Sequence, residues 1–194
     1  MTDPVSSIRQ GDGLILIDVQ QDFCPGGALP IKEGHQTVPV LNRWVQAFCD
    51  RNLPVYASRD SHPDRHLSFE EQGGPWPPHC IQDSPGAEFH PDLTLPDNAV
   101  KISKGVRFDH DQNSIFDDTG LASQLERDGV KRLWVGGLAQ DVCVLTSVLD
   151  ARKVGIEVCL LRDATRPVTA EGGEEAIQKI EAAQTRIVTE IGPT

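Results

Sequence analysis

Short apolar runs recur along the chain of 194 residues and alternate with segments of helical spacing. Several runs are nearly continuous in Leu, Ile and Val, which is typical of strands that are buried on both faces of a parallel sheet. Six runs are predicted to be strands, at residues 13–19, 54–58, 99–102, 132–136, 157–161 and 185–188.

Four segments between these runs repeat apolar residues with the spacing of an amphipathic helix. They cover residues 38–48, a segment around Leu121 and Leu125 that ends near Gly129, residues 142–154 and residues 174–183. Strands that alternate with helices form parallel sheets with right-handed crossovers. The pattern therefore predicts an α/β three-layer sandwich with a central six-stranded, mainly parallel sheet and helices on both faces.

One long stretch interrupts this alternation. Residues 60–97 are rich in Pro and Gly and contain His62, His66, His79 and His90. Loops of this length inside a compact domain are usually functional or disordered, and the histidines favour function. We expect residues 1–194 to form a single domain with a metal-binding loop insertion around residues 60–97.

Composition narrows the classes of partner. Hydrophobic residues make up 38% of the chain and charged residues 24%, as in ordinary globular proteins, and the formal net charge is -11. Such an acidic chain repels phosphate backbones and anionic membranes, so we expect a small-molecule substrate, no nucleic acid and no membrane partner. A homo-oligomer is possible, but the oligomeric state stays open because no exposed apolar stripe stands out in the sequence.

The cysteines and the first residues bear on the cellular compartment. The chain has 5 cysteines, an odd number, with wide spacing and no CxxC pair, which indicates reduced thiols rather than a disulfide framework. The first ten residues are polar and lack the apolar stretch of a secretory signal. We expect a cytoplasmic protein.

Asp18 ends the first apolar run. Open α/β sheets place their sites at the carboxyl ends of buried strands, so Asp18 is a candidate site residue. An equally good interpretation is a capping residue for the loop that follows.

Cys143 lies between a predicted strand and a predicted helix. With Asp141 as the helix N-cap, Cys143 falls in the first turn, where the helix dipole is expected to lower its pKa below the ~8.5 of a free thiol. The alternative is a small buried apolar residue. Lys104 follows the third strand; such a lysine is most often simply solvated, but near Cys143 its charge would stabilise a thiolate.

The metal candidates follow the second predicted strand. Asp60, His62 and His66 lie within seven residues, and His79 follows. One carboxylate and several imidazoles suit Zn²⁺, Fe²⁺ or Mn²⁺, although the spacing matches no zinc-finger or HExxH pattern. The alternative is a set of surface histidines in a polar loop.

Five motifs together resemble the nicotinamidase/pyrazinamidase family of the isochorismatase-like cysteine hydrolases. The resemblance runs from about residue 13 to residue 188, and the motifs occur in the family's order. They are Asp18-Val19-Gln20-Gln21-Asp22-Phe23, Arg59-Asp60-Ser61-His62, Trp76-Pro77-Pro78-His79-Cys80, Lys104-Gly105 and Gly136-Gly137-Leu138-Ala139-Gln140-Asp141-Val142-Cys143.

The resemblance implies a role for each matching residue. The family's catalytic triad falls on Asp18, Lys104 and Cys143, and its metal ligands fall on Asp60, His62 and His79, with His66 as a further ligand whose direct bond stays open. Its oxyanion hole falls on the backbone of Ala139 and Cys143, and the peptide Leu138–Ala139 is expected to be cis. Substrate contacts fall on Phe23, Trp76 and Leu138.

The implied reaction is metal-dependent hydrolysis of nicotinamide to nicotinate and ammonia through a cysteine thioester, with pyrazinamide as a further substrate. One divalent metal ion is expected. Zinc is the first choice, and iron and manganese are the alternatives. The loop at residues 106–112 differs among family members and leaves the substrate preference open. Rival interpretations are another amide or ureide hydrolase of the superfamily, a binding module without catalysis, and a structural zinc site.

Overall fold

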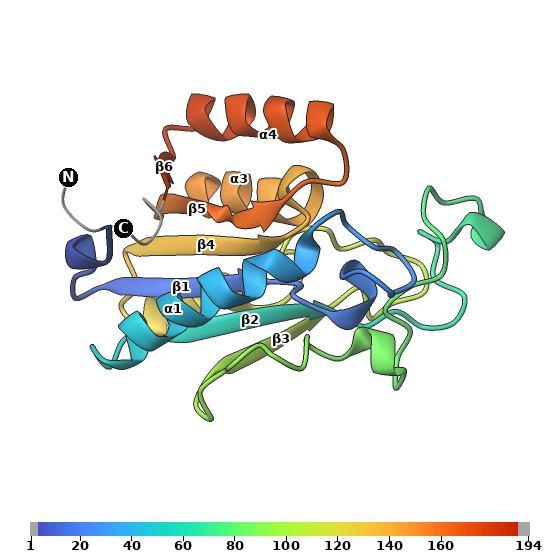
Figure 1. The fold of residues 1–194 in the computed structure, drawn as a ribbon, viewed down its shortest axis with the longest axis horizontal. Coiled ribbons are helices and arrows are strands. Elements are labelled where there is room, and N and C mark those ends of the chain that lie inside the picture. The colour runs from blue at the N-terminus through green and yellow to red at the C-terminus, as the bar shows by residue number, and fades with distance from the viewer. Residues whose placement is uncertain (1–3, 190–194) are drawn as a thin grey trace.

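A parallel sheet of six strands forms the centre of the computed structural model, which describes residues 4–189 (Figure 1). The strands are β1 (Asp12–Ile17), β2 (Val55–Asp60), β3 (Val100–Lys104), β4 (Arg132–Leu138), β5 (Glu157–Arg166) and β6 (Arg186–Val188). Their order is β3-β2-β1-β4-β5-β6, and all neighbouring pairs are parallel. The six predicted strands are confirmed, although β5 continues beyond its predicted end at residue 161.

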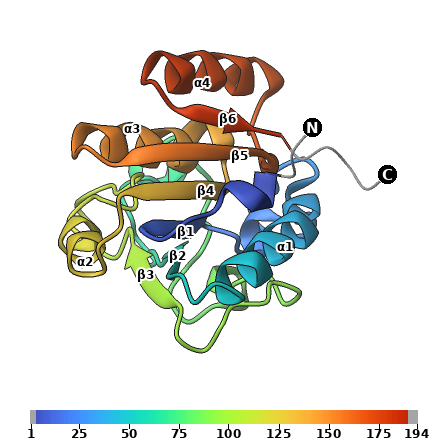
Figure 2. The same cartoon turned by 90° about the vertical axis from the view of Figure 1, so that its left-hand side faces the viewer.

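Helices cover both faces of this sheet, as the alternation of elements predicts (Figure 2). The helix α1 (Thr37–Cys49) packs on one face, and α2 (Leu121–Arg127), α3 (Leu145–Lys153) and α4 (Ala170–Ala182) pack on the other. The helix predicted at residues 142–154 has a different start, because a π-helical turn, Gln140–Val144, precedes α3. No helix among residues 4–189 is both long and apolar enough to cross a membrane.

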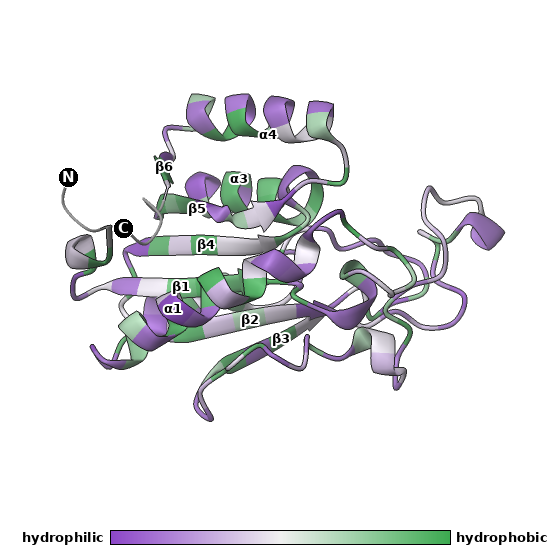
Figure 3. Ribbon diagram, in the orientation of Figure 1, coloured by the Kyte–Doolittle hydropathy of each residue, from purple (hydrophilic) through white to green (hydrophobic). Residues whose placement is uncertain are grey.

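The strand β1 shows why its sequence is apolar at consecutive positions. Leu14 and Leu16 join the apolar cluster beneath α1, whereas Ile15 and Ile17 join the cluster beneath α2, α3 and α4. Side chains of a strand alternate between faces, and both faces are covered here. The covering helices are amphipathic, with both apolar and polar residues around each of them (Figure 3).

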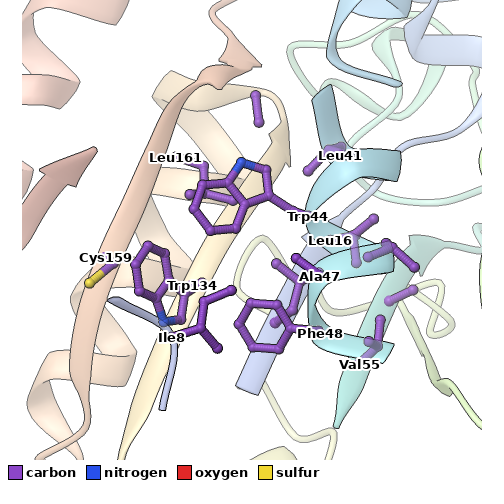
Figure 4. Packing of buried hydrophobic residues seen from close by; sticks show 14 of the residues in the cluster. Ile8, Leu16, Leu41, Trp44, Ala47, Phe48, Val55, Trp134, Cys159 and Leu161 are labelled. Atoms are coloured by element: carbon purple, nitrogen blue, oxygen red, sulfur yellow. The ribbon is translucent and has the colours of Figure 1, made fainter. Parts of the chain in front are cut away.

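Aromatic side chains fill the core beneath α1 (Figure 4). The rings of Trp44 on α1 and Trp134 on β4 lie 5.0 Å apart, and the Phe48 ring meets that of Trp134 edge-on at 6.5 Å. Aromatic pairs at these separations stabilise a core beyond the area they bury. This packing holds α1 against the sheet at the point where β1 and β4 are neighbours.

The strand order fixes where the chemistry can lie. The chain proceeds from β1 through β2 to β3 on one side and from β4 through β5 to β6 on the other. A crevice forms at such a reversal, outside the carboxyl ends of the strands. The connection from β2 to β3 extends beyond that edge of the sheet (Figure 1), and it contains the predicted metal-binding loop.

Candidate active site

Lys104 occupies the centre of the candidate site and is fully buried. It ends β3, directly opposite Asp60 in the β2–β3 ladder. Its Nζ lies 2.8 Å from Oδ2 of Asp18, contacts Oδ1 of Asp60, and lies 3.5 Å from Sγ of Cys143. Burial lowers the pKa of Lys104, but the charges of Asp18 and Asp60 outweigh it and hold the pKa well above its usual range. Lys104 is therefore a permanent cation between two carboxylates and a thiol.

Asp18 follows β1 and is fully buried, with a left-handed backbone conformation (φ 47°). Its Oδ1 accepts a hydrogen bond of 2.7 Å from the Ser58 hydroxyl on β2. Burial raises the pKa of Asp18, while the charge of Lys104 acts in the opposite direction. A carboxylate with a raised pKa accepts a proton more readily than an exposed one, which suits a general base. Its carboxylate thus faces the buried site.

Cys143 lies in the π-helical turn Gln140–Val144 that follows β4. Its Sγ and one carboxylate oxygen each of Asp18 and Asp60 lie within 4.8 Å of one another. The prediction of a lowered pKa for Cys143 is wrong. Burial raises the pKa of its thiol well above the usual value. The charge of Lys104 lowers this pKa, and the charge of Asp18 raises it further. The thiol therefore needs a base to become a nucleophile, and Asp18 is close enough to serve.

Asp141 is not the N-cap that the sequence predicted. The residue before the turn is Ala139, and it has no side-chain cap. Instead, the Asp141 carboxylate accepts hydrogen bonds from the backbone N–H groups of Val168, at 2.8 Å, and Thr169, at 3.3 Å. The prediction failed because these donors, at the start of α4, are far along the chain. The nucleophile turn is thereby tied to the neighbouring helix.

A candidate metal-binding group lies beside Asp18, Lys104 and Cys143. One donor atom each of Asp60, His62 and His79 lies within 4.8 Å of the other two, and all three residues are buried. Nδ1 of His62 lies 2.9 Å from the Gly105 carbonyl, and Nδ1 of His79 lies 2.8 Å from the Pro77 carbonyl. Each Nδ1–H thus has an acceptor, which leaves Nε2 as the donor to a metal. The three residues fit a divalent metal.

Asp60 carries a negative charge in this arrangement. Burial raises the pKa of Asp60, but the charge of Lys104 and a hydrogen bond with His62 outweigh burial and hold its pKa well below the usual range. A carboxylate that stays ionised is the form that binds a metal.

His66 lies beside this group without being part of it. Its ring stacks on that of His62 at 4.2 Å. Its Nδ1 lies 2.7 Å from the Ser68 hydroxyl, and its Nε2 lies 3.2 Å from the His110 carbonyl. Both ring nitrogens thus have protein partners, and a direct bond from His66 to the metal stays a prediction.

The thiol and the candidate metal group open into one pocket, whose empty space is about 550 Å³ when the open solvent at its mouth is included. The expected aromatic residues Phe23 and Trp76 line it, together with Ala139. The peptide Leu138–Ala139 is cis, as expected. The structure does not support the expected substrate contact of the Leu138 side chain. This side chain is fully buried in an apolar cluster with Phe23 and does not line the pocket.

Several polar residues that support the site escaped the sequence analysis. Ser58 bonds Asp18, and the Gln20 amide bonds both the N–H and the carbonyl of Asp60 at 2.8 Å. Gln112 is buried and lines the pocket. Each is polar within or beside a buried strand or in a loop, a signal too common to single out without the tertiary fold.

Comparisons with known proteins agree with this geometry. Residues 12–191 match the isochorismatase domain family. The nicotinamidase of Escherichia coli is 37% identical over 84% of this chain and 86% of its own length. A crystal structure of the pyrazinamidase of Pyrococcus horikoshii in complex with zinc has a TM-score of 0.90 and 44% identity, covering 92% of this chain and 99% of that one.

A third similar protein has a ligand in its structure. PnC1 from L. infantum, in complex with nicotinate, has a TM-score of 0.86 and 35% identity, covering 97% of this chain and 96% of its own. The matched region spans β1 to β6 and includes every residue of the candidate site. On this match, and on the fold and site that it covers, the chain belongs to the isochorismatase domain family.

Proposed function

We propose that this chain is a nicotinamidase that hydrolyses nicotinamide to nicotinate and ammonia, and that it also hydrolyses pyrazinamide. The observation that carries the proposal is the meeting of Asp18, Lys104 and Cys143 at the carboxyl edge of the sheet, beside a metal-binding group in the same pocket. The similar nicotinamidase and pyrazinamidase support this choice of substrates.

The reaction begins with the thiol of Cys143. Asp18 accepts the proton from Sγ, and the cation of Lys104 stabilises the thiolate that forms. The sulfur attacks the carboxamide carbon, and the electron pair of the C=O bond moves to oxygen. The backbone N–H groups of Ala139 and Cys143 stabilise this oxyanion, and loss of one such donor typically costs about 3 kcal/mol.

Two bond cleavages complete the turnover. The C–N bond breaks as Asp18 returns its proton to nitrogen, and ammonia leaves behind a thioester on Cys143. Asp18 then takes a proton from water, whose oxygen attacks the thioester carbon. The C–S bond breaks, the sulfur recovers the proton from Asp18, and nicotinate is released.

The residues that would hold the metal and the aromatic residues of the pocket would orient the substrate. Asp60, His62 and His79 would hold the ion, which we propose to be zinc, with iron or manganese as alternatives. When bound, it supplies a Lewis acid that orients the ring nitrogen of the substrate. Phe23 and Trp76 flank the ring within the pocket.

Ammonia release from nicotinamide by the purified protein tests this function, with Cys143→Ala as the matched variant. We expect release by the wild type and near-complete loss of turnover in Cys143→Ala, with the metal content retained because Cys143 lies outside the proposed ligand set. A folded, metal-loaded wild type that releases no ammonia would exclude nicotinamide as the substrate. Metal analysis separates this function from that of superfamily amide or ureide hydrolases that lack the metal set.

A further inference from the structure

The loop after β3 contains a buried glutamine that touches both halves of the site. The Gln112 backbone carbonyl accepts a hydrogen bond of 3.3 Å from Nζ of Lys104. Its side-chain Oε1 accepts a hydrogen bond of 2.8 Å from the N–H of Gly105, and its Nε2 donates to the carbonyl of Asp117. Gln112 is 4% exposed, so water does not readily replace these partners.

Gly105 connects this glutamine to a proposed metal ligand. Its N–H bonds the Gln112 side chain, and its carbonyl accepts from Nδ1 of His62 at 2.9 Å. Gly105 has a φ of 64°, and a Cβ added there would overlap the His62 ring. The peptide at Gly105 is therefore pressed against the imidazole, and a movement of this peptide must move His62.

We propose that Gln112 is a positioning residue that sets His62 for metal binding through Gly105 and aligns the Lys104 ammonium through its own carbonyl. The inference rests on the proposed function for the identity of the two groups it positions. Groups that orient a metal ligand from outside typically change metal affinity or activity 10- to 100-fold when they are removed. Because Gln112 acts through one intervening peptide, we expect an effect near the lower end of that range.

The first test is the affinity of the metal-free protein for Zn²⁺ in competition with a chelating dye. Gln112→Met keeps the length of the side chain but removes both hydrogen bonds, and we expect it to weaken zinc binding about tenfold. At saturating zinc, its kcat on nicotinamide should still be about tenfold below that of the wild type. The backbone carbonyl that accepts from Lys104 remains in this variant, but the side-chain bonds that hold it in place are gone.

Thr119→Val is the matched control. Its hydroxyl donates to the Ile115 carbonyl and accepts from the N–H of Leu121, the first residue of α2, so its hydrogen bonds among the described residues involve neither Lys104 nor the candidate metal ligands. We expect this variant to bind zinc and turn over substrate as the wild type does. Unchanged zinc affinity in Gln112→Met would overturn the proposal, as would an equal loss in Thr119→Val.

Gln112→Glu provides the test in case the methionine variant does not fold. It keeps the acceptor for the Gly105 N–H and loses only the donor to the Asp117 carbonyl, so we expect it to bind zinc within a few-fold of the wild type. A tenfold loss of zinc affinity in Gln112→Glu would refute the positioning route. Zinc affinity is measured without turnover, so a wild type that binds zinc but releases no ammonia refutes the proposed function and leaves this inference standing.

Discussion

Replacing Lys104 with methionine removes a cation that contacts both Asp18 and Asp60. Lys104 and Asp18 are fully buried and Asp60 is 5% exposed, so the variant leaves two carboxylates close together without a positive partner. Breaking a buried ion pair on one side typically costs about 3–5 kcal/mol. For a protein of this size, that loss lowers the melting temperature by roughly 6–20 °C, at about 2–4 °C for each kcal/mol.

The pH dependence of this loss is a sharper test than its size. In the wild type, the pKa of Asp60 lies well below its usual range, so its contribution to stability persists until the pH falls below about 4. Without Lys104, the pKa of Asp60 rises above that of the unfolded chain, and the pKa of Asp18, which burial already raises in the wild type, rises further. The folded variant then binds more protons than the unfolded one, and its stability increases as the pH falls through these raised values. The difference between wild type and variant should therefore be largest at pH 8 and narrow toward pH 5.

Urea unfolding of the metal-free proteins at pH 5, 6, 7 and 8, with a chelator present, measures this difference. Lys153→Met is the matched control, because Lys153 pairs with Asp150 on the exposed surface of α3, where such pairs are worth about 0–1 kcal/mol. A Lys104→Met protein whose stability deficit stays constant across this range, or is no larger than that of Lys153→Met, would refute the account of Lys104 as the charge partner of two buried carboxylates.

Three further substitutions test other parts of the site. His62→Ala should abolish stoichiometric metal binding, and unchanged metal content by elemental analysis would remove His62 from the ligand set. Ser58→Ala removes a hydrogen bond that favours ionised Asp18, so the acid limb of the pH profile of kcat/KM should move to higher pH; an unmoved limb would argue against Asp18 as the base. Asp141→Ala removes the acceptor of the exposed Val168 N–H, which should lower the free energy of unfolding by about 0.5–1.5 kcal/mol. A chemical denaturation curve that matches the wild type would contradict this.

The sequence predicted the elements of the fold well because each of them carries a local signal. The run at residues 13–19 is apolar at nearly every position, and β1 is indeed buried on both faces. The π-helical turn before α3 has no such signal, since its apolar residues also fit an ordinary helix. For that reason, the sequence did not predict that the helical segment begins at residue 140 with a π-helical turn, and the capping role of Asp141 was wrong.

The candidate site also contains features that the sequence predicted and features that it did not. Asp18, Lys104 and Cys143 were predicted from motifs, and the structure brings them together. The pKa of Cys143 could not be predicted, because burial and the carboxylates of Asp18 and Asp60, which approach the thiol only in the folded protein, raise it. Gln112 was missed because its partners, Gly105 and Asp117, are defined only by the folded loop.

The ladder between β2 and β3 ties the length of one strand to the chemistry. Asp60 and Lys104 are opposite each other in that ladder, and a slip of one residue would turn Lys104 to the other face of the sheet. A single-residue insertion or deletion inside Val100–Lys104 should therefore abolish catalysis even if the sheet still forms. Length changes in the long connection before β3 leave this register intact, so they can alter the pocket around an unchanged charge pair as long as His62 and His79 keep their places.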